Sequence, residues 1–288
     1  MNELSNQRQQ IRHAFARASK SYDAAAVLQR EVLQRLLERL VELNLQPEQI
    51  LDIGTGTGSG IRALRNTYRR ATLIGLDFAL PMLRQLRSNS GIWRKPIAVC
   101  ADAHSLPFRD NSFDLVFSSL TFQWCDELPK ALAESRRVLA DNGVLLFATL
   151  GPDTLSELRS AWAEVDETPH VNMFTDMHII GDALLQAGFK NPVVDVERIV
   201  LSYASVKQLL LEIKALGANT VVAPTRKTGL MGKRRFQKMQ QAYQQFELEN
   251  GHYPASFEII FGLAWQSENQ TEPGAAPISF VPPDELPK

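Results

Sequence analysis

Residues 51–60 read Leu-Asp-Ile-Gly-Thr-Gly-Thr-Gly-Ser-Gly, with a glycine at every second position directly after a short apolar run. Glycine adopts positive φ and lets another group approach the backbone at little cost. The spacing differs by one position from the G-x-G-x-x-G pattern of dinucleotide folds, and the Lys-Ser/Thr ending of a P-loop is absent. The acidic Asp52 inside the strand would repel a pyrophosphate but attract a cationic amino acid. The stretch therefore favours S-adenosylmethionine as the ligand of the loop.

Strands and helices alternate on both sides of this loop, which predicts a parallel sheet with helices on both faces and a ligand site at the carboxyl ends of the strands. Apolar runs predict strands at Ile50–Ile53, Ala71–Leu76, Ile97–Ala101, Phe113–Ser118, Val144–Leu150, Val193–Leu201 and Ser256–Trp265. Helical patterns cover residues 5–45, Gly60–Tyr68, Pro81–Ser88, Leu128–Leu139, most of 153–190, and Val206–Leu216.

Two further aspartates end the strands that follow the loop, as a nucleoside site requires. Asp77 ends the second strand, where its carboxylate could accept both ribose hydroxyls. Asp102 ends the third strand and could accept from the adenine amine, although an aspartate after a strand is often only a helix cap. The predicted cofactor site comprises Asp52, Gly54, Thr55, Gly56, Gly58, Asp77, Phe78 and Met82 beside the adenine, Asp102, and the backbone amide of Ala103.

Composition narrows the class of protein. The 288 residues carry a net charge of −1, so no global field recruits nucleic acid or a membrane, and no apolar run is long enough to span a bilayer. The two cysteines lack metal-ligand spacing, and the N-terminus lacks the apolar core of a signal peptide. We expect a cytoplasmic protein without a metal, and a disordered tail at 267–288.

The core resembles class I S-adenosylmethionine-dependent methyltransferases, through residues 50–150 and their Phe113–Val116, Arg137–Leu139 and Asp141–Gly143 motifs. The flanks resemble the malonyl-[acyl-carrier protein] O-methyltransferases of biotin synthesis, and this resemblance covers most of residues 10–266. It implies an α/β, Rossmann-like, mostly parallel seven-stranded sheet. It also implies an N-terminal helical arm at 1–45 and a methyltransferase domain at 46–266 with insertions at about 152–190 and 217–250. The flanking motifs are His13–Asp23, His170–Phe174, Asp176–His178, Ala187–Phe189, Lys214–Asn219, Arg226–Leu230 and Pro254–Ile259.

The resemblance implies methylation of the free carboxylate of a malonyl thioester on acyl-carrier protein. A carboxylate with a reference pKa near 4 is already ionised at neutral pH, so we expect no general base. Positioning falls to Arg226 first, with Lys214 as its competitor and Asn172 and His178 as further donors. Tyr22 is either a lid residue at the methyl group or an anchor of the arm. Gln123, Trp124 and Phe174 either line the acceptor pocket or fill the core.

Residues 226–238 contain six basic side chains and no acidic one. Such a run is often just a solvated helix face, but it could also dock the acidic carrier protein. RNA is the rival partner, and a single aromatic, Phe236, argues against it. The predicted docking residues are Lys227, Lys233, Arg234, Arg235 and Lys238.

Two other functions remain open at this point. The core motifs would also suit a methyltransferase of a small quinone-like acceptor. An assembly factor that keeps the fold but acts on a protein partner is the alternative from a different class.

Overall fold

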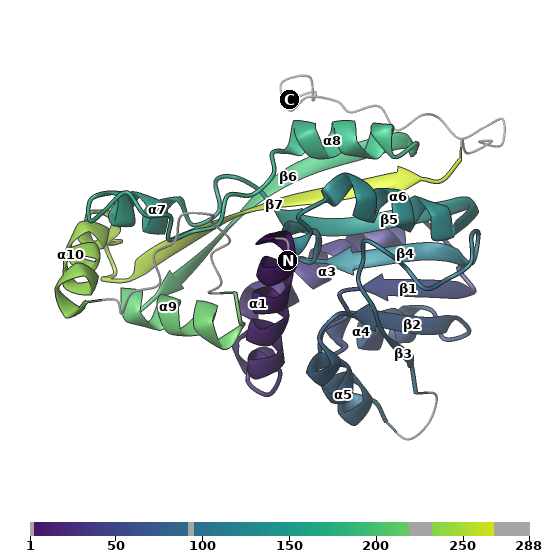
Figure 1. Ribbon diagram of the computed structural model, residues 1–288, viewed down its shortest axis with the longest axis horizontal. Coiled ribbons are helices and arrows are strands. Elements are labelled where there is room, and N and C mark those ends of the chain that lie inside the picture. Colours follow the sequence, from purple (N-terminus) through teal and green to yellow (C-terminus); the bar gives the residue numbers. More distant parts are fainter. Residues whose placement is uncertain (1–2, 92–94, 219–231, 268–288) are drawn as a thin grey trace, which may run out of the picture.

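The computed structural model describes residues 3–91, 95–218 and 232–267. Within them one seven-stranded sheet has the order β3-β2-β1-β4-β5-β7-β6, with β7 antiparallel to both of its neighbours and the other pairs parallel. The predicted mostly parallel α/β sheet is therefore confirmed (Figure 1). The strands are β1 Gln49–Ile53, β2 Thr72–Asp77, β3 Ile97–Cys100, β4 Phe113–Ser119, β5 Leu139–Leu150, β6 Lys190–Tyr203 and β7 Tyr253–Trp265.

Helices cover both faces of the sheet. In the described ranges no helix is both long and apolar enough to cross a membrane. The helices are α1 Glu3–Ala18, α2 Tyr22–Ala25, α3 Val27–Glu42, α4 Ser59–Thr67, α5 Leu80–Asn89, α6 Leu128–Val138, α7 Ser156–Ala163, α8 Met177–Gln186, α9 Val206–Ala215 and α10 Lys233–Tyr243, with short 3-10 turns η1 Phe122–Trp124 and η2 Gln244–Phe246.

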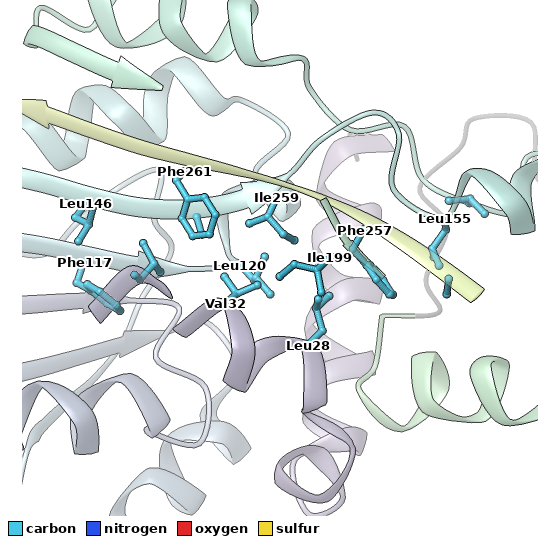
Figure 2. Packing of buried hydrophobic residues seen from close by; sticks show 14 of the residues in the cluster. Leu28, Val32, Phe117, Leu120, Leu146, Leu155, Ile199, Phe257, Ile259 and Phe261 are labelled. Carbon is cyan, nitrogen blue, oxygen red and sulfur yellow. The ribbon is translucent and has the colours of Figure 1, made fainter. Parts of the chain in front are cut away.

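Strand alternation explains the two cores. Successive side chains of a strand point to opposite faces, so Leu115 and Phe117 pack under α3 and α4 whereas Val116 packs under α6 and α8. On α3 the spacing of Leu28, Val32, Leu36 and Leu40 gives one buried helical face. Figure 2 shows Leu28 and Val32 meeting the strand side chains of this first core.

The two C-terminal strands are long and carry a second group of helices. β6 and β7 contain 14 and 13 residues, and in Figure 1 they run past the end of β5 toward α7, α9 and α10. We call these three helices the far lobe. Ile199 and Phe257 join it to the first core, which continues to Leu158 and Met239 on α7 and α10. The far lobe is thus packed on the same core as the sheet.

Three predictions of secondary structure need correction. The helix expected over 5–45 is three helices, because Ser21 Oγ donates to the carbonyl of Ala18 at 3.1 Å and Ala26 leaves helical geometry. The segment expected to be mostly helical at 153–190 holds α7 and α8 with an irregular stretch between them. β5 also begins at Leu139 rather than Val144, since Asn142 adopts φ 61° and a register shift absorbs the expected turn.

Candidate functional site

The glycine loop connects β1 to α4, as the sequence predicts. The amides of Gly54 and Thr55 donate to the carbonyl of Leu76 at 2.8 and 2.9 Å, which fixes the loop at the carboxyl end of β2. Gly58 has φ 89°, and a Cβ there would lie 2.1 Å from Cδ1 of Leu86. Gly56 has φ 53°, but a Cβ there would meet nothing within 4 Å. Gly58 therefore serves packing, whereas Gly56 leaves space in front of the loop.

Asp52 lies beneath the loop. Its carboxylate is buried and accepts from the hydroxyl of Thr55 at 2.7 Å. Burial raises the pKa of Asp52 to about 7, against the hydrogen bond from Thr55, and Asp77 adds to the rise. Asp52, Thr55 and Gly58 are not on the wall of the cavity that the loop borders. They shape the loop from behind.

Asp77 is the carboxylate that faces this cavity from β2. Its two oxygens accept from the backbone amides of Gly56 at 3.0 Å and Ala79 at 2.8 Å. Burial raises the pKa of Asp77 to about 6, although both amides oppose the rise. The carboxylate is thereby held in one orientation at the carboxyl end of the strand, where hydroxyl donors of a ligand could reach it.

The cavity in front of the loop, which we call the loop cavity, has a volume of about 80 Å³. This is small beside the 300–1,000 Å³ typical of ligand pockets. Side chains of α1 and α2, namely Arg8, Phe15 and Tyr22, form part of its wall. Side chains of the N-terminal helices thus narrow the space in front of the loop. Of the predicted cofactor residues, the cavity wall includes Gly54, Gly56, Asp77, Phe78, Met82, Asp102 and Ala103.

Arg8 fastens α1 across the loop cavity. Its guanidinium contacts Asp126 at 2.6 Å, Glu127 at 2.9 Å and, more loosely, Asp102 at 3.5 Å. His104 lies between two of these acids, with Nδ1 2.5 Å from Asp102 and Nε2 3.2 Å from Asp126. The hydrogen bond from His104 lowers the pKa of Asp102 to about 2. The sequence carried no signal for Arg8, because its partners lie more than 90 residues away.

The segment that follows α1 also lies over the loop cavity. Asp23 accepts from the Thr57 hydroxyl in the glycine loop and from Asn89 at 3.2 Å. Phe15 packs edge-on against Trp124, with ring centroids 5.3 Å apart. Tyr22 lines the cavity wall, and burial raises the pKa of its phenol, with help from nearby carboxylates. Phe15 lies within the His13–Asp23 motif, but the sequence did not predict its contact with Trp124.

A second cavity of about 260 Å³, the lobe cavity, lies between the sheet and the far lobe. Its wall is mostly apolar, with contributions such as Leu158, Trp162 and Phe257. Four residues line both cavities: Phe15, Tyr22, Leu120 and Trp124. We call this place the junction. Leu120 has φ 53°, a conformation that costs energy for a branched residue and is enriched at functional sites.

The predicted substrate residues divide into those on the cavity and those away from it. His178 lies outside the walls of both cavities, with its side chain 83% exposed and Nδ1 2.8 Å from Asp176. Arg226 and Lys227 lie outside the described residues. No group of three metal-ligating side chains occurs in the described part of the chain. The lobe cavity is lined by Tyr22, Gln123, Trp124, Asn172, Phe174 and Lys214 of the predicted set.

The basic helix α10 has two kinds of cation. Arg235 pairs with Asp166, which also contacts Nε2 of His170 at 3.1 Å on the wall of the lobe cavity. The remaining cations of the helix, Lys233, Arg234 and Lys238, are exposed and form no ion pair with any described residue.

Comparison with known proteins identifies the family of this chain. A family model for a methyltransferase domain matches residues 51–147. A malonyl-[acyl-carrier protein] O-methyltransferase of Gallionella capsiferriformans (strain ES-2) is 46% identical over 272 residues, covering 92% of this chain and 93% of the relative. The enzyme of that name from Laribacter hongkongensis (strain HLHK9) is 46% identical over 264 residues, covering 89% and 88%.

Solved structures agree on the fold. The YcgJ protein of Bacillus subtilis has a TM-score of 0.57 at 17% identity, covering 82% of this chain and 99% of its own. Phosphoethanolamine N-methyltransferase 2 of Haemonchus contortus, in complex with S-adenosyl-L-methionine, has a TM-score of 0.50 at 20% identity, covering 80% and 52%. The chain therefore belongs to the malonyl-[acyl-carrier protein] O-methyltransferase family of S-adenosylmethionine-dependent methyltransferases.

Proposed function

We propose that this chain methylates the free carboxylate of a malonyl thioester carried on acyl-carrier protein, with S-adenosylmethionine as methyl donor. The observation that carries the proposal is the junction, where a cavity beside the glycine loop meets a larger, mostly apolar cavity at Phe15, Tyr22, Leu120 and Trp124. Such an arrangement lets two ligands enter by separate routes and meet end to end. Family membership supplies the identity of the two ligands.

The residues of the loop cavity fit the nucleoside half of the donor. Asp77 lines the cavity with a carboxylate already oriented by two backbone amides, and it suits the ribose hydroxyls. Phe78 and Met82 offer apolar surface for the adenine, and Asp102 offers an acceptor for its amine. The open space beside Gly56 lets the methyl donor lie close to the protein backbone of the loop. Asp52 contributes by holding Thr55, rather than by contact with the ligand.

The reaction needs placement and exclusion of water more than proton transfer. The bound donor supplies an electrophilic sulfonium methyl group, which the carboxylate oxygen takes as the carbon–sulfur bond breaks, leaving a methyl ester and a thioether. No proton moves, so no residue has to act as a base. Phe15, Leu120 and Trp124 surround the junction with apolar atoms. Removing water there favours the meeting of a carboxylate with a sulfonium cation.

Positioning of the malonyl group is assigned to polar residues on the lobe-cavity wall. Tyr22 lies at the junction, and Asn172 and Lys214 line the cavity beyond it. Lys214 is an exposed residue on the cavity wall, and it offers the positive charge that a carboxylate entering an apolar cavity requires. We keep Arg226 as a candidate from its motif. His178 is not included, because its side chain points into solvent.

Docking of the acidic carrier is assigned to α10. Lys233, Arg234 and Lys238 are exposed cations on a helix that packs against α7, whose Leu158 and Trp162 line the lobe cavity. Attraction between this helix and an acidic protein would increase the rate of encounter and would weaken with salt. We propose that α1 and α2 form the lid, that residues 46–266 form the methyltransferase domain, and that the far lobe serves the acceptor.

One experiment separates this function from its alternatives. Purified protein is incubated with S-adenosylmethionine and malonyl-acyl-carrier protein, and the carrier is analysed by mass spectrometry for the addition of one methyl group. Methylation of the malonyl carrier but not of acetyl-carrier protein, which lacks the free carboxylate, is expected. Absence of methylation together with proven donor binding would overturn the proposal. Transfer to a quinone precursor instead would support the small-acceptor alternative.

A further inference from the structure

His170 is a polar side chain on the wall of the apolar lobe cavity that the proposed reaction leaves without a role. Its ring stacks on Trp162, with centroids 3.7 Å apart and planes inclined by 13°. Its Nε2 lies 3.1 Å from Asp166. Among the residues that the structure describes, none forms a hydrogen bond with Nδ1. Trp162 and His170 both line the cavity, whereas Asp166 does not.

The surroundings of Asp166 decide which ring nitrogen carries the proton. Burial opposes ionisation of Asp166, but the guanidinium of Arg235 and the backbone amide of Thr168 outweigh it and hold the pKa of the carboxyl well below its usual range. An ionised carboxylate only accepts hydrogen bonds. Nε2 of His170 must therefore be the donor toward Asp166. In the neutral imidazole the proton then sits on Nε2, and Nδ1 carries a lone pair.

We infer that Nδ1 of His170 accepts a hydrogen bond from an amide N–H of the thioester arm that carries the malonyl group. The inference rests on the proposed function, in which this arm occupies the lobe cavity. Acyl carriers and coenzyme A share a pantetheine arm with two secondary amides, and each amide that enters an apolar cavity needs a partner. The malonyl carboxylate has only lone pairs to offer, so a neutral Nδ1 acceptor would repel it.

The position of His170, away from the junction, agrees with a role in binding the arm rather than the malonyl carboxylate. His170 stacks on Trp162 of α7, in the far lobe, whereas the transfer of the methyl group is assigned to the junction at Tyr22 and Trp124. The same Asp166 is held by Arg235 of α10, the helix assigned to carrier docking. The arm would thus pass His170 on its way from the docked carrier to the junction, and His170 is a positioning residue for the arm.

The test compares wild type with His170→Phe on substrates that do or do not contain the arm. Phenylalanine keeps an aromatic ring for Trp162, and Asp166 keeps Arg235 and Thr168 as partners. The substrates are malonyl-acyl-carrier protein, malonyl-coenzyme A, and the malonyl thioester of ethanethiol, which has no amide. Methyl transfer is measured at one common pH for all three substrates. Circular dichroism and the affinity for S-adenosylhomocysteine show that each variant is folded.

For both pantetheine thioesters we expect kcat/KM of His170→Phe to fall about tenfold, the size of one hydrogen bond left unmade. For the ethanethiol thioester we expect less than a twofold change. Tyr22→Phe provides the comparison, since a loss at the junction should fall equally on all three substrates. Free pantetheine as an inhibitor gives a second measure, and its inhibition constant should rise by a similar factor in His170→Phe.

Three results would overturn the inference. Equal losses on all three substrates would mean that His170 acts on the malonyl group or on the fold. Unchanged kinetics on all three would mean that it does not meet the arm. Failure of wild type to methylate any malonyl thioester would instead count against the proposed function. A loss confined to the carrier-protein substrate would place His170 in protein docking and would also refute the inference.

Discussion

Alanine substitutions at Gly56 and Gly58 should separate ligand binding from stability within one loop. Both glycines have positive φ, at 53° and 89°, so alanine at either position pays the energy of a left-handed conformation. Only at Gly58 does the added methyl group meet a neighbour, 2.1 Å from Cδ1 of Leu86. Leu86 is fully buried, so it cannot turn away without disturbing the core between α5 and the sheet.

The expected magnitudes follow from these contacts. At Gly56 the left-handed backbone costs about 1–2 kcal/mol, and the lower entropy of the unfolded chain returns about 0.5–1 kcal/mol. Gly56→Ala should therefore destabilise the protein by about 1 kcal/mol or less. At Gly58 overpacking adds about 1–3 kcal/mol, for a total of about 1–4 kcal/mol. The methyl group at Gly56 projects into the space before the loop, so the affinity for S-adenosylhomocysteine should fall at least about tenfold, or about 1.4 kcal/mol.

Urea unfolding followed by circular dichroism gives the stabilities, and isothermal titration calorimetry gives the affinities. Gly181→Ala is the matched control, because Gly181 lies inside α8 with nothing within 4 Å of an added Cβ. Alanine there should stabilise the helix by about 0.5–1 kcal/mol. The reasoning is wrong if Gly56→Ala is as destabilised as Gly58→Ala, or if Gly56→Ala binds S-adenosylhomocysteine as wild type does.

Three further predictions concern charges. Asp52 and Asp77 have folded-state pKa values of about 7 and about 6, above the ordinary 3.8, so the unfolded chain holds fewer protons than the folded protein between these limits. The unfolding free energy of the ligand-free protein should therefore fall by up to about 4 kcal/mol as the pH rises from 5 to 8. When urea unfolding is measured across this range, the free energy of Asp52→Asn should change less with pH than that of wild type. The same pH dependence in both proteins would contradict this. Arg8→Ala should speed the dissociation of S-adenosylhomocysteine about three- to tenfold in stopped-flow experiments, because α1 loses its ion pairs with Asp126 and Glu127. An unchanged rate would show that these ion pairs do not hold α1 over the bound ligand. Reversal of Lys233 and Arg234 to Glu should lower kcat/KM for malonyl-acyl-carrier protein at least about tenfold at low salt, with a much smaller effect on malonyl-coenzyme A; equal losses would exclude docking on α10.

Much of the site could be predicted because its residues follow strands. Asp77 and Asp102 lie where β2 and β3 end, and parallel strands bring their carboxyl ends to one edge of a sheet. The sequence placed Asp52 in β1 but could not give the direction of its side chain, since the same strand position allows a carboxylate to face the cavity or to lie beneath the loop. In the structure the carboxylate lies beneath the loop, where it accepts a hydrogen bond from Thr55 and is buried under α4.

Other site residues could not be predicted because they depend on distant contacts. Arg8 reads in the sequence as a charge on a polar helix, and only the fold brings Asp126 and Glu127 beside it. Arg235 reads as part of a uniform basic run, yet its pairing with Asp166 sets it apart from the exposed Lys233 and Arg234. His178 lies in a segment that resembles the family, but its side chain is exposed and its Nδ1 lies 2.8 Å from the capping Asp176.

By itself the sequence determined the sheet, the loop at residues 51–60 and the class of donor, because strand periodicity and glycine spacing are local properties of the chain. Only the tertiary structure decided that Phe15, Tyr22, Leu120 and Trp124 form one junction between two cavities. These residues come from α1, α2 and the segment after β4, and no local pattern relates them. Their meeting depends on the packing of the N-terminal helices over the carboxyl edge of the sheet, which burial of apolar residues of α1 such as Ile11 and Ala14 stabilises.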